Sequence, residues 1–249
     1  MLETVTMLGV FKSLVVISII TLAWSCSRDE SPEPIGSYTY FPLQEGMVRV
    51  YKVDSYNYEK LPIEVKRFWL KEETGPVVEG LNGEPFTEIY VFRKNSWNGD
   101  WQKIRTDLAR NTDESAERYI ENVNYVKLAY PISLHSEWNY TPFNDVSYLY
   151  DASFDFSRSH IVKAHDYQIV GDRGFDSTLH VVYYSSSERN RRILRGEFRE
   201  RYANHVGLYK KIEVNADFQP DPTQSDTTGN YTPIRGYKYI QTLVDFKNP

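Results

Sequence analysis

Apolar and polar residues alternate with a period of two along much of the chain. Because successive side chains of a β-strand point to opposite faces of a sheet, this alternation predicts strands that are buried on one side. Apolar stripes at the helical spacing of about 3.6 residues are nearly absent. The best helical candidate, residues 194–202, carries its charges at alternate positions and is also predicted to be a strand. The other alternating runs are residues 47–54, 63–70, 89–93, 148–151 and 179–184.

Turn-forming residues separate these runs. Asn82-Gly83 and Asn98-Gly99 each stand between two strand-like segments, which predicts hairpins because both central residues of such a turn need positive φ. Further reversals are predicted at residues 171–174 and 204–207. Residues 219–233 hold three prolines and one glycine and are too long for a tight hairpin, so they predict a polar loop. The pattern as a whole predicts an all-β chain with antiparallel neighbours.

The composition is that of a globular protein, with 41% hydrophobic and 25% charged residues. Aromatic residues make up 15%, including 20 tyrosines, and such residues fit the half-buried face of a strand. Residues 38–249 are long enough for one sizeable all-β domain. The net charge of −5 argues against nucleic acid as a partner, because nucleic-acid binding relies on clustered Lys and Arg.

An apolar run at residues 14–24 precedes the only cysteine of the chain, Cys26. Its length suits the apolar centre of an export signal and falls short of the roughly 20 residues that a transmembrane helix needs. The residues after the cysteine are polar, acidic and broken by prolines. We interpret residues 1–25 as a bacterial lipoprotein signal peptide, with Met1 or Met7 as its start, that is cut before Cys26.

Lipidation of the Cys26 thiol, with palmitate or a similar chain, agrees with this single cysteine. An unpaired thiol in an oxidising compartment is reactive unless it is capped. More than one acyl chain on Cys26 anchors a protein in the membrane almost permanently. Residues 26–37 then form a flexible lipidated linker. The alternative is an ordinary secretory signal followed by an incidental free cysteine.

The residues that follow Cys26 bear on the destination of the protein. Ser27 stands where many inner-membrane lipoproteins have a retaining aspartate, which favours the outer membrane. Arg28-Asp29-Glu30 resembles the short charged tag of many surface-exposed Bacteroidota lipoproteins, and a periplasm-facing orientation is the alternative. The predicted partners are the membrane, through the N-terminal lipid, and the lipoprotein export machinery.

The segment Tyr40-Phe41-Pro42-Leu43, followed by Gly46 and a strand that contains Tyr51, resembles the opening of many Bacteroidota outer-membrane lipoproteins of unassigned function. The resemblance spans most of the predicted domain, and its blocks are strand and turn signatures. It implies a strongly curved antiparallel sheet or a half-open β-barrel, and it implies no reaction. The further blocks are residues 128–132, Trp138, and residues 174–181 and 202–212.

Motif searches predict no catalytic residue, metal or cofactor. The nucleophile elbow, the P-loop, the His-Glu-x-x-His motif and paired cysteines do not occur in the sequence. Of the five histidines, His160 and His165 are the closest pair. Their odd spacing places them on opposite faces of a regular strand, which is wrong for joint metal ligation. Two surface histidines are therefore the favoured interpretation.

Carboxylates offer an alternative in which the protein is an enzyme. Asp151, Asp155 and Asp166, or Glu197 and Glu200, are candidates for the acid/base pair that glycoside hydrolysis requires. A chain with 34 acidic residues brings such pairs together by chance, however. Solvated surface carboxylates are therefore the favoured interpretation of these residues.

Two tryptophans mark a candidate contact site for a ligand. Trp97 and Trp101 flank the predicted Asn98-Gly99 turn, where exposed indoles can stack on a sugar ring or enter a lipid interface. The alternative, which we favour, is a cross-strand aromatic pair that closes the hairpin.

Two short segments resemble the O-glycosylation signal of exported Bacteroidota proteins. They are Asp176-Ser177-Thr178 and Asp226-Thr227-Thr228, with Ser177 and Thr227 as the acceptors. Thr227 is the better candidate because it lies in the predicted polar loop, where a glycosyltransferase has access.

Taken together, these features predict a non-catalytic outer-membrane or surface lipoprotein with a binding or structural role in the envelope. One alternative is a carrier that encloses an apolar ligand within its curved sheet. Another is a surface component of an uptake system that binds or degrades glycans.

Overall fold

The computed structural model describes residues 37–80, 83–134, 136–143, 158–170, 173–187, 193–220 and 231–249. These residues form twelve β-strands and a short 3-10 helix, η1, and they contain no α-helix. Within these ranges, no helix has the length and apolarity that crossing a membrane requires. The predicted signal peptide and Cys26 lie outside them. The elements are η1 (Ser37–Tyr40), β1 (Val48–Asn57), β2 (Glu64–Glu79), β3 (Pro85–Lys94), β4 (Gln102–Asn111), β5 (Ser115–Ile120), β6 (Val123–Ala129), β7 (Glu137–Trp138), β8 (Ser159–Val170), β9 (Arg173–Ser187), β10 (Ile193–Ala203), β11 (Gly207–Pro220) and β12 (Tyr231–Lys247).

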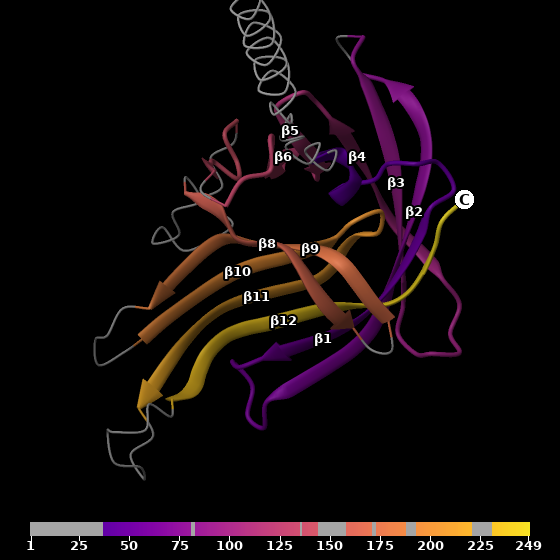
Figure 1. The fold of residues 1–249 in the computed structure, drawn as a ribbon. Helices are drawn as coiled ribbons and strands as arrows, with labels where there is room; N and C mark the ends of the chain where they lie inside the picture. The colour runs from indigo at the N-terminus through magenta and orange to yellow at the C-terminus, as the bar shows by residue number, and fades with distance from the viewer. Residues whose placement is uncertain are drawn as a thin grey trace, which may run out of the picture. The chain divides into compact units, whose positions relative to one another are not determined.

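All twelve strands belong to one sheet with the order β6-β5-β4-β3-β2-β1-β12-β11-β10-β9-β8-β7. Every neighbouring pair is antiparallel. The first six strands form one meander and the last six another, and the two meanders meet where β1 pairs with β12 (Figure 1). The first and last strands of the chain are thus central neighbours in the sheet.

The sheet curls until its two edges nearly meet. Beyond β7, the carbonyl of Tyr140 accepts a hydrogen bond from the Val126 N–H of β6 (2.8 Å). The indole Nε1 of Trp138 donates to the Val126 carbonyl (2.9 Å). These two bonds join the edges of the sheet, so the predicted strongly curved, barrel-like antiparallel sheet is confirmed.

The strands predicted from alternation are confirmed at four of the five runs. The runs 89–93 and 179–184 lie within β3 and β9, and the runs 47–54 and 63–70 lie within β1 and β2 except for their first residues. Residues 194–202 lie within β10 and form no helix. The fifth run, residues 148–151, lies outside the described residues.

Asn98-Gly99 lies between β3 and β4 as predicted, but neither residue has the positive φ expected for that turn, so the predicted turn type is wrong. Asn82 and residues 171–172 lie outside the described residues. Gly83, with positive φ, lies in the β2–β3 connection, and Gly207, also with positive φ, is the first residue of β11 after the turn at residues 204–206. The predicted loop at residues 219–233 is wrong at both ends, because Gln219 pairs with Thr232 in the β11–β12 ladder. Cross-strand pairing overrides the local turn signal there, and residues 221–230 lie outside the described residues.

The inner face of the sheet carries most of the core. On β1, Arg49, Tyr51 and Val53 are buried, while the residues between them face outward. Aromatic rings account for much of the buried volume, which explains the high tyrosine content. The tyrosines that are almost completely buried are Tyr40, Tyr51, Tyr183, Tyr202 and Tyr209.

Candidate functional site

Two groups of buried ionic side chains fill much of the interior. The first joins β2, β4 and β5, where Arg118 Nη2 donates to Glu72 (2.7 Å) and to Asp107 (2.7 Å). Arg105 donates to the other carboxylate oxygen of Asp107 (2.9 Å). Burial opposes the charge of Glu72, but the attraction of Arg118 outweighs it and lowers the pKa of Glu72. The charges of this group therefore balance one another inside the protein.

The second group joins β6, β9 and β10. Lys127 Nζ lies 3.0 Å from Glu200 Oε1 and donates to the hydroxyl of Tyr140 (2.8 Å). The other oxygen of Glu200 accepts hydrogen bonds from Tyr183 (2.8 Å) and Tyr202. Burial lowers the pKa of Lys127 to about 8. Burial raises the pKa of Glu200, but the attraction of Lys127 outweighs it and brings that pKa to about 2. Both side chains are therefore charged at neutral pH.

A small hollow lies beside the first of these groups. Its volume is about 20 Å³, and Tyr51, Glu72, Arg118 and Leu208 contribute to its lining. This volume is enough for about one water molecule. An apolar ligand does not fit in this hollow, whereas a larger hollow lies at the rim of the sheet.

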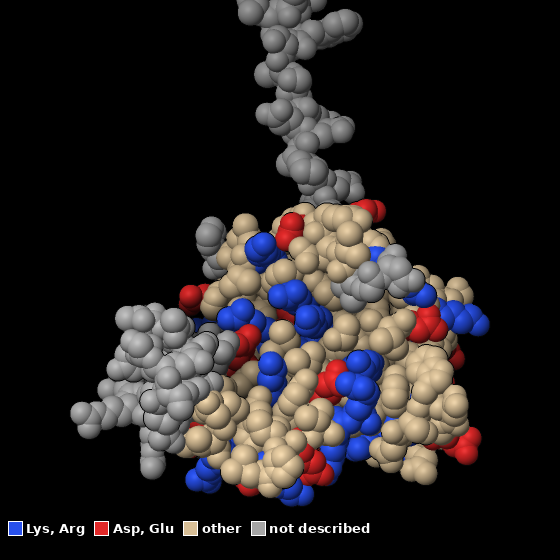
Figure 2. All heavy atoms as spheres, turned by 90° about the horizontal axis from the view of Figure 1, so that it is seen from below, with Lys and Arg blue, Asp and Glu red and all other residues tan. Residues whose placement is uncertain are grey.

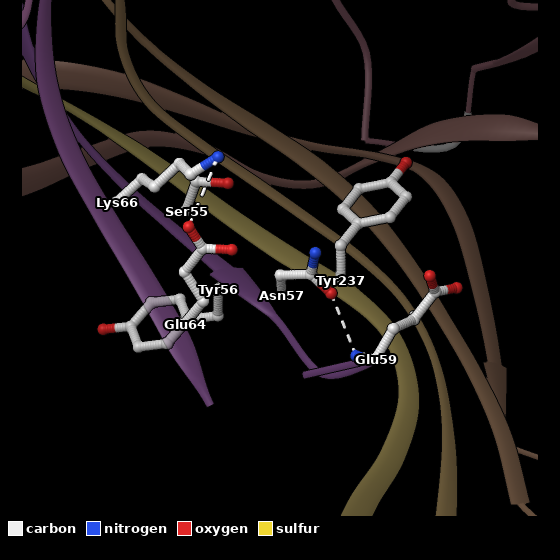
Figure 3. Close-up of a pocket in the computed structure, with 8 residues that line it drawn as sticks. Ser55, Tyr56, Asn57, Glu59, Glu64, Lys66 and Tyr237 are labelled. Carbon is white, nitrogen blue, oxygen red and sulfur yellow. Dashed lines mark hydrogen bonds and ion pairs between the residues drawn. The ribbon is translucent and has the colours of Figure 1, made fainter. Parts of the chain in front are cut away.

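A polar cleft lies at the rim where β1 ends and β2 begins. Its volume is about 290 Å³, and we call it the strand-end cleft. Pairing of Asn57 with Glu64 and with Tyr237 brings β1, β2 and β12 together there. Figure 3 shows the lining side chains, with Tyr56 and Tyr237 on different sides of the view. The lining residues are Ser55, Tyr56, Asn57, Glu59, Glu64, Lys66, Gly236 and Tyr237.

The polar groups of the strand-end cleft are held by local contacts. The side-chain oxygen of Asn57 accepts a hydrogen bond from the Glu59 N–H (2.9 Å). Glu64 lies 2.8 Å from Lys60 and 3.4 Å from Lys66. The hydrogen bond from Lys60 is the main cause that lowers the pKa of Glu64. The cleft thus presents a fixed amide, an ammonium and a carboxylate, a set that suits a ligand with many hydroxyl groups.

Tyr237 and Gly236 line both this cleft and a second hollow of about 370 Å³. The Tyr237 hydroxyl donates to Glu213 Oε1 (2.5 Å), which fixes the ring. Gly236 has a φ of +99°, and a Cβ atom there would lie 2.1 Å from the Asn215 carbonyl oxygen. The lining of both hollows therefore depends on a glycine at this position. The second hollow is also lined by Glu59, Asn215, Ala216, Asp217 and Arg235.

The predicted tryptophan site forms a cluster on the outer face. Trp97 is 62% exposed and packs edge-on against Trp69 of β2, with ring centroids 5.9 Å apart. The ammonium of Lys94 lies over both Trp97 (4.8 Å) and Trp101 (4.7 Å). Trp97 and Trp101 both lie in the β3–β4 connection, outside the ladder that ends at Arg93 and Gln102, and Trp97 packs on Trp69 instead, so the favoured cross-strand pair is wrong. We call Trp69, Trp97, Trp101 and Lys94 the indole cluster.

Of the two predicted O-glycosylation acceptors, Ser177 and Thr227, only Ser177 lies within the described residues. Ser177 lies in β9, where its hydroxyl contacts the Tyr40 hydroxyl (2.5 Å) and His165 Nδ1 (3.2 Å). A sugar on Ser177 has to displace these contacts. Thr227, the better candidate, lies outside the described residues, as does Cys26.

The histidine prediction rested on a regular strand, and β8 is irregular. Its register shifts between Ile161 and Lys163 and again between Ala164 and Asp166, and His165 has a φ of +56°. His160 Nδ1 contacts the Arg158 carbonyl (3.0 Å), whereas His165 contacts Tyr40 and Ser177. The described residues include no group of three or more His, Cys, Asp or Glu side chains arranged to hold a metal ion.

The interpretation of the candidate carboxylates as solvated is wrong for two of them. Glu200 is 3% exposed and Glu197 is 8% exposed. Glu200 is buried because Lys127 compensates its charge, and Glu197 pairs with Arg199 (3.1 Å). The two alternate to opposite faces of β10, so they form no acid/base pair. Asp166 pairs with Lys163 (3.5 Å), and Asp151 and Asp155 lie outside the described residues.

Sequence analysis missed both the strand-end cleft and the buried ionic groups. The cleft combines residues 55–66 with residues 236–237, and the pairing of β1 with β12 that joins them is not encoded locally. Its only local signal is the isolated Gly236 within a strand-like run, which can mark a bulge or a close backbone approach.

No protein-family model and no curated protein matches the chain. Three solved structures are similar at low identity. A protein of Bacteroides fragilis, described as exported with a YmcC-like fold, is 13% identical with a TM-score of 0.42, covering 83% of this chain and 98% of its own. One of Parabacteroides distasonis, described as a lipoprotein, is 14% identical with a TM-score of 0.37 and coverages of 84% and 98%. A domain of Vibrio parahaemolyticus, described as that of an outer-membrane lipoprotein-sorting protein, is 9% identical with a TM-score of 0.21 and coverages of 81% and 85%. No residue role follows from these distant similarities.

Proposed function

We propose that this protein is a non-catalytic binding lipoprotein of the outer membrane, anchored through an acylated Cys26. The export-type apolar run and the single cysteine that follows it support the anchor. The strand-end cleft is the observation that carries the binding role. It is a hollow of about 290 Å³ at the rim of the sheet, lined mostly by polar residues, whereas the hollow beside Tyr51 and Arg118 is only about 20 Å³.

The lining of the cleft supports a ligand rich in hydroxyl groups, such as a sugar. Asn57 and Lys66 supply hydrogen-bond donors, Glu59 supplies acceptors, and Tyr237 supplies an aromatic ring. This chemistry favours glycan binding over the carriage of an apolar ligand. The buried carboxylates Glu72 and Glu200 are engaged by cations in the core, which favours binding over hydrolysis.

The anchor is tested by labelling cells with an alkyne analogue of palmitate. We expect label on the wild-type chain and none on Cys26→Ser. We also expect the unprocessed precursor to accumulate with globomycin, which blocks the lipoprotein signal peptidase. An unlabelled wild-type chain, or processing that globomycin leaves unchanged, contradicts the anchor.

The binding role is tested on a glycan array with three single variants. Glu59→Ala and Lys66→Ala change exposed residues of the cleft, and Lys103→Ala changes an exposed residue outside it. We expect the first two to lose the signal of the bound glycan and the third to keep it. Equal signals from all three, or a shorter glycan recovered after incubation, contradict non-catalytic binding in the cleft.

A further inference from the structure

One row of directly paired residues crosses the outer face of eight neighbouring strands. Residues that pair directly in an antiparallel sheet point to the same face. The central members of the row point outward because they alternate with buried residues: Arg201 stands between Glu200 and Tyr202, and Lys52 between Tyr51 and Val53. Five of its eight positions are Lys or Arg. From β8 to β3, the row is Lys163, His180, Arg201, Lys210, Thr242, Lys52, Trp69 and Lys94.

The centre of this row, which we call the basic row, is not neutralised. Arg201 and Lys210 are direct neighbours across β10 and β11, and like charges in that position destabilise a sheet. No described carboxylate forms an ion pair with Arg201, Lys210 or Lys94, whereas Lys52 pairs with Asp54 (3.5 Å) and Lys163 pairs with Asp166 (3.5 Å). Burial and the nearby charges of Arg201 and Lys238 lower the pKa of Lys210. The like charges of Arg201 and Lys210 thus stand side by side at the centre of the row without a described carboxylate to compensate them.

The positive charge follows a line rather than a broad patch. In the adjacent row, Arg67 pairs with Asp54 (2.7 Å) and Arg199 pairs with Glu197 (3.1 Å). Figure 2, which views the molecule from the side of β1 and β12, shows Lys and Arg side chains gathered along the middle of this face. This concentration stands out in a chain whose net charge is −5.

The shape of the sheet distinguishes between anionic partners. The basic row spans eight of twelve strands in a sheet whose edges nearly meet, so its ends face different directions. A flat bilayer surface contacts only part of such a row, whereas a flexible chain can follow it around the sheet. Neighbouring strands are about 4.8 Å apart, so the cations recur at roughly 5–10 Å. This arrangement suits a linear polymer with regularly spaced negative charges.

The indole cluster lies at one end of the basic row and shares Trp69 and Lys94 with it. Trp97 exposes most of its ring beside the Lys94 ammonium. A ring face beside a cation offers stacking to one sugar unit and charge pairing to its acidic group. Both features therefore fit the same kind of chain.

We infer that the basic row binds a linear acidic glycan, with carboxylate or sulfate groups on Arg201 and Lys210 and one sugar ring against Trp97. The choice of a glycan over nucleic acid rests on the envelope location of the proposed function. This surface is distinct from the strand-end cleft, whose lining includes none of these three residues.

The test measures binding of heparin and of polygalacturonate to the chain from residue 26 onward by isothermal titration calorimetry at low and high salt. We compare Arg201→Gln/Lys210→Gln with Arg67→Gln/Lys103→Gln, which removes the same charge from outside the basic row. We expect the first pair to weaken binding of at least one of the two polymers about tenfold or more and the second pair to change it little. Wild-type binding should weaken with salt. Equal losses in both double variants overturn the inference.

Thermal unfolding separates a binding defect from misfolding. Because Arg201→Gln/Lys210→Gln removes a like-charge pair, we expect a melting temperature at or above that of the wild type. A folded variant with wild-type affinity for both polymers overturns the inference.

Two further binding partners, anionic vesicles and single-stranded DNA, test whether the basic row binds a membrane surface or nucleic acid instead of a glycan. Cosedimentation with vesicles of phosphatidylglycerol and phosphatidylcholine, in the absence of glycan binding, overturns the inference in favour of a membrane surface. Tighter binding of single-stranded DNA than of either polymer overturns it in favour of nucleic acid. If the basic row binds neither polymer, the labelling of Cys26 and the effect of Lys66→Ala on the glycan array stay as expected. The failure of this inference is therefore distinguishable from the failure of the proposed function.

Discussion

The ammonium of Lys127 and the carboxylate of Glu200 lie 3.0 Å apart across the interior of the sheet, although 73 residues separate them in sequence. They join β6, at one edge of the sheet, to β10 on the other side of the barrel-like interior. Tyr140, Tyr183 and Tyr202 surround the pair with hydroxyl groups. This ion pair therefore helps to close the sheet, in the place where a carrier protein would hold its ligand.

Removing one member of this pair is expected to destabilise the protein strongly. Lys127→Met leaves the Glu200 charge buried without its cation, at a cost of about 3–5 kcal/mol in the free energy of unfolding. Urea unfolding measures it. The matched control is Lys60→Met, whose partner Glu64 is 2.8 Å away at the surface, and there we expect a change below about 0.5 kcal/mol. Similar losses in the two variants would contradict the burial of the ion pair.

Acid should lower the free energy of unfolding because it protonates the carboxylate of Glu200. The pKa of Glu200 is about 2 in the folded protein, below its ordinary value of 4.5. Its contribution to stability is therefore complete above about pH 4.5 and is lost as the pH falls toward 2, by roughly 3 kcal/mol. Urea unfolding at several pH values measures this slope. Glu200→Gln should unfold at a lower urea concentration at neutral pH, and its free energy of unfolding should fall less steeply with decreasing pH. If it falls as steeply as in the wild type, Glu200 is not the cause of the acid sensitivity.

The alternation of apolar and polar residues was sufficient to predict the strands but not their order in the sheet. Alternation at residues 47–54 and 194–202 identified β1 and β10, because one face of each is buried. The pairing of β1 with β12 joins opposite ends of the chain, and no local signal encodes it. The loop predicted at residues 219–233 was too long for the same reason, since pairing with β12 draws Gln219 into the ladder.

Sites were harder to predict than strands. Trp97 and Trp101 were identifiable because they flank a turn signal, although the cation between them comes from Lys94. The burial of Glu200 was not identifiable, because a carboxylate on a strand is buried only when a distant cation such as Lys127 faces it. The basic row likewise appears only when the register of eight strands is known.

The edge-closing tryptophan should matter far more for stability than the exposed one. Trp138 is buried and donates to the Val126 carbonyl of β6, so Trp138→Ala should cost about 3–5 kcal/mol and loosen the contact between the sheet edges. Trp97→Ala removes an indole that is 62% exposed and should stay within about 0.5 kcal/mol of the wild type. Chemical denaturation compares them, and hydrogen exchange at the Val126 amide reports edge closure directly. Wild-type exchange in Trp138→Ala would show that the indole does not hold the edges together.

Gly236 lines both polar hollows at the rim of the sheet. A Cβ atom at Gly236 would lie 2.1 Å from the Asn215 carbonyl oxygen, at a φ of +99° that side chains disfavour. Gly236→Ala should therefore cost at least about 2 kcal/mol and displace Tyr237 from the cleft. Gly46→Ala is the control, because Gly46 also has positive φ, but its nearest neighbour would be the Pro249 side chain at 3.5 Å. Its cost should be only about 1 kcal/mol of backbone strain. Glycan binding should fall in Gly236→Ala and persist in Gly46→Ala; if both bind equally, the ligand does not occupy the strand-end cleft.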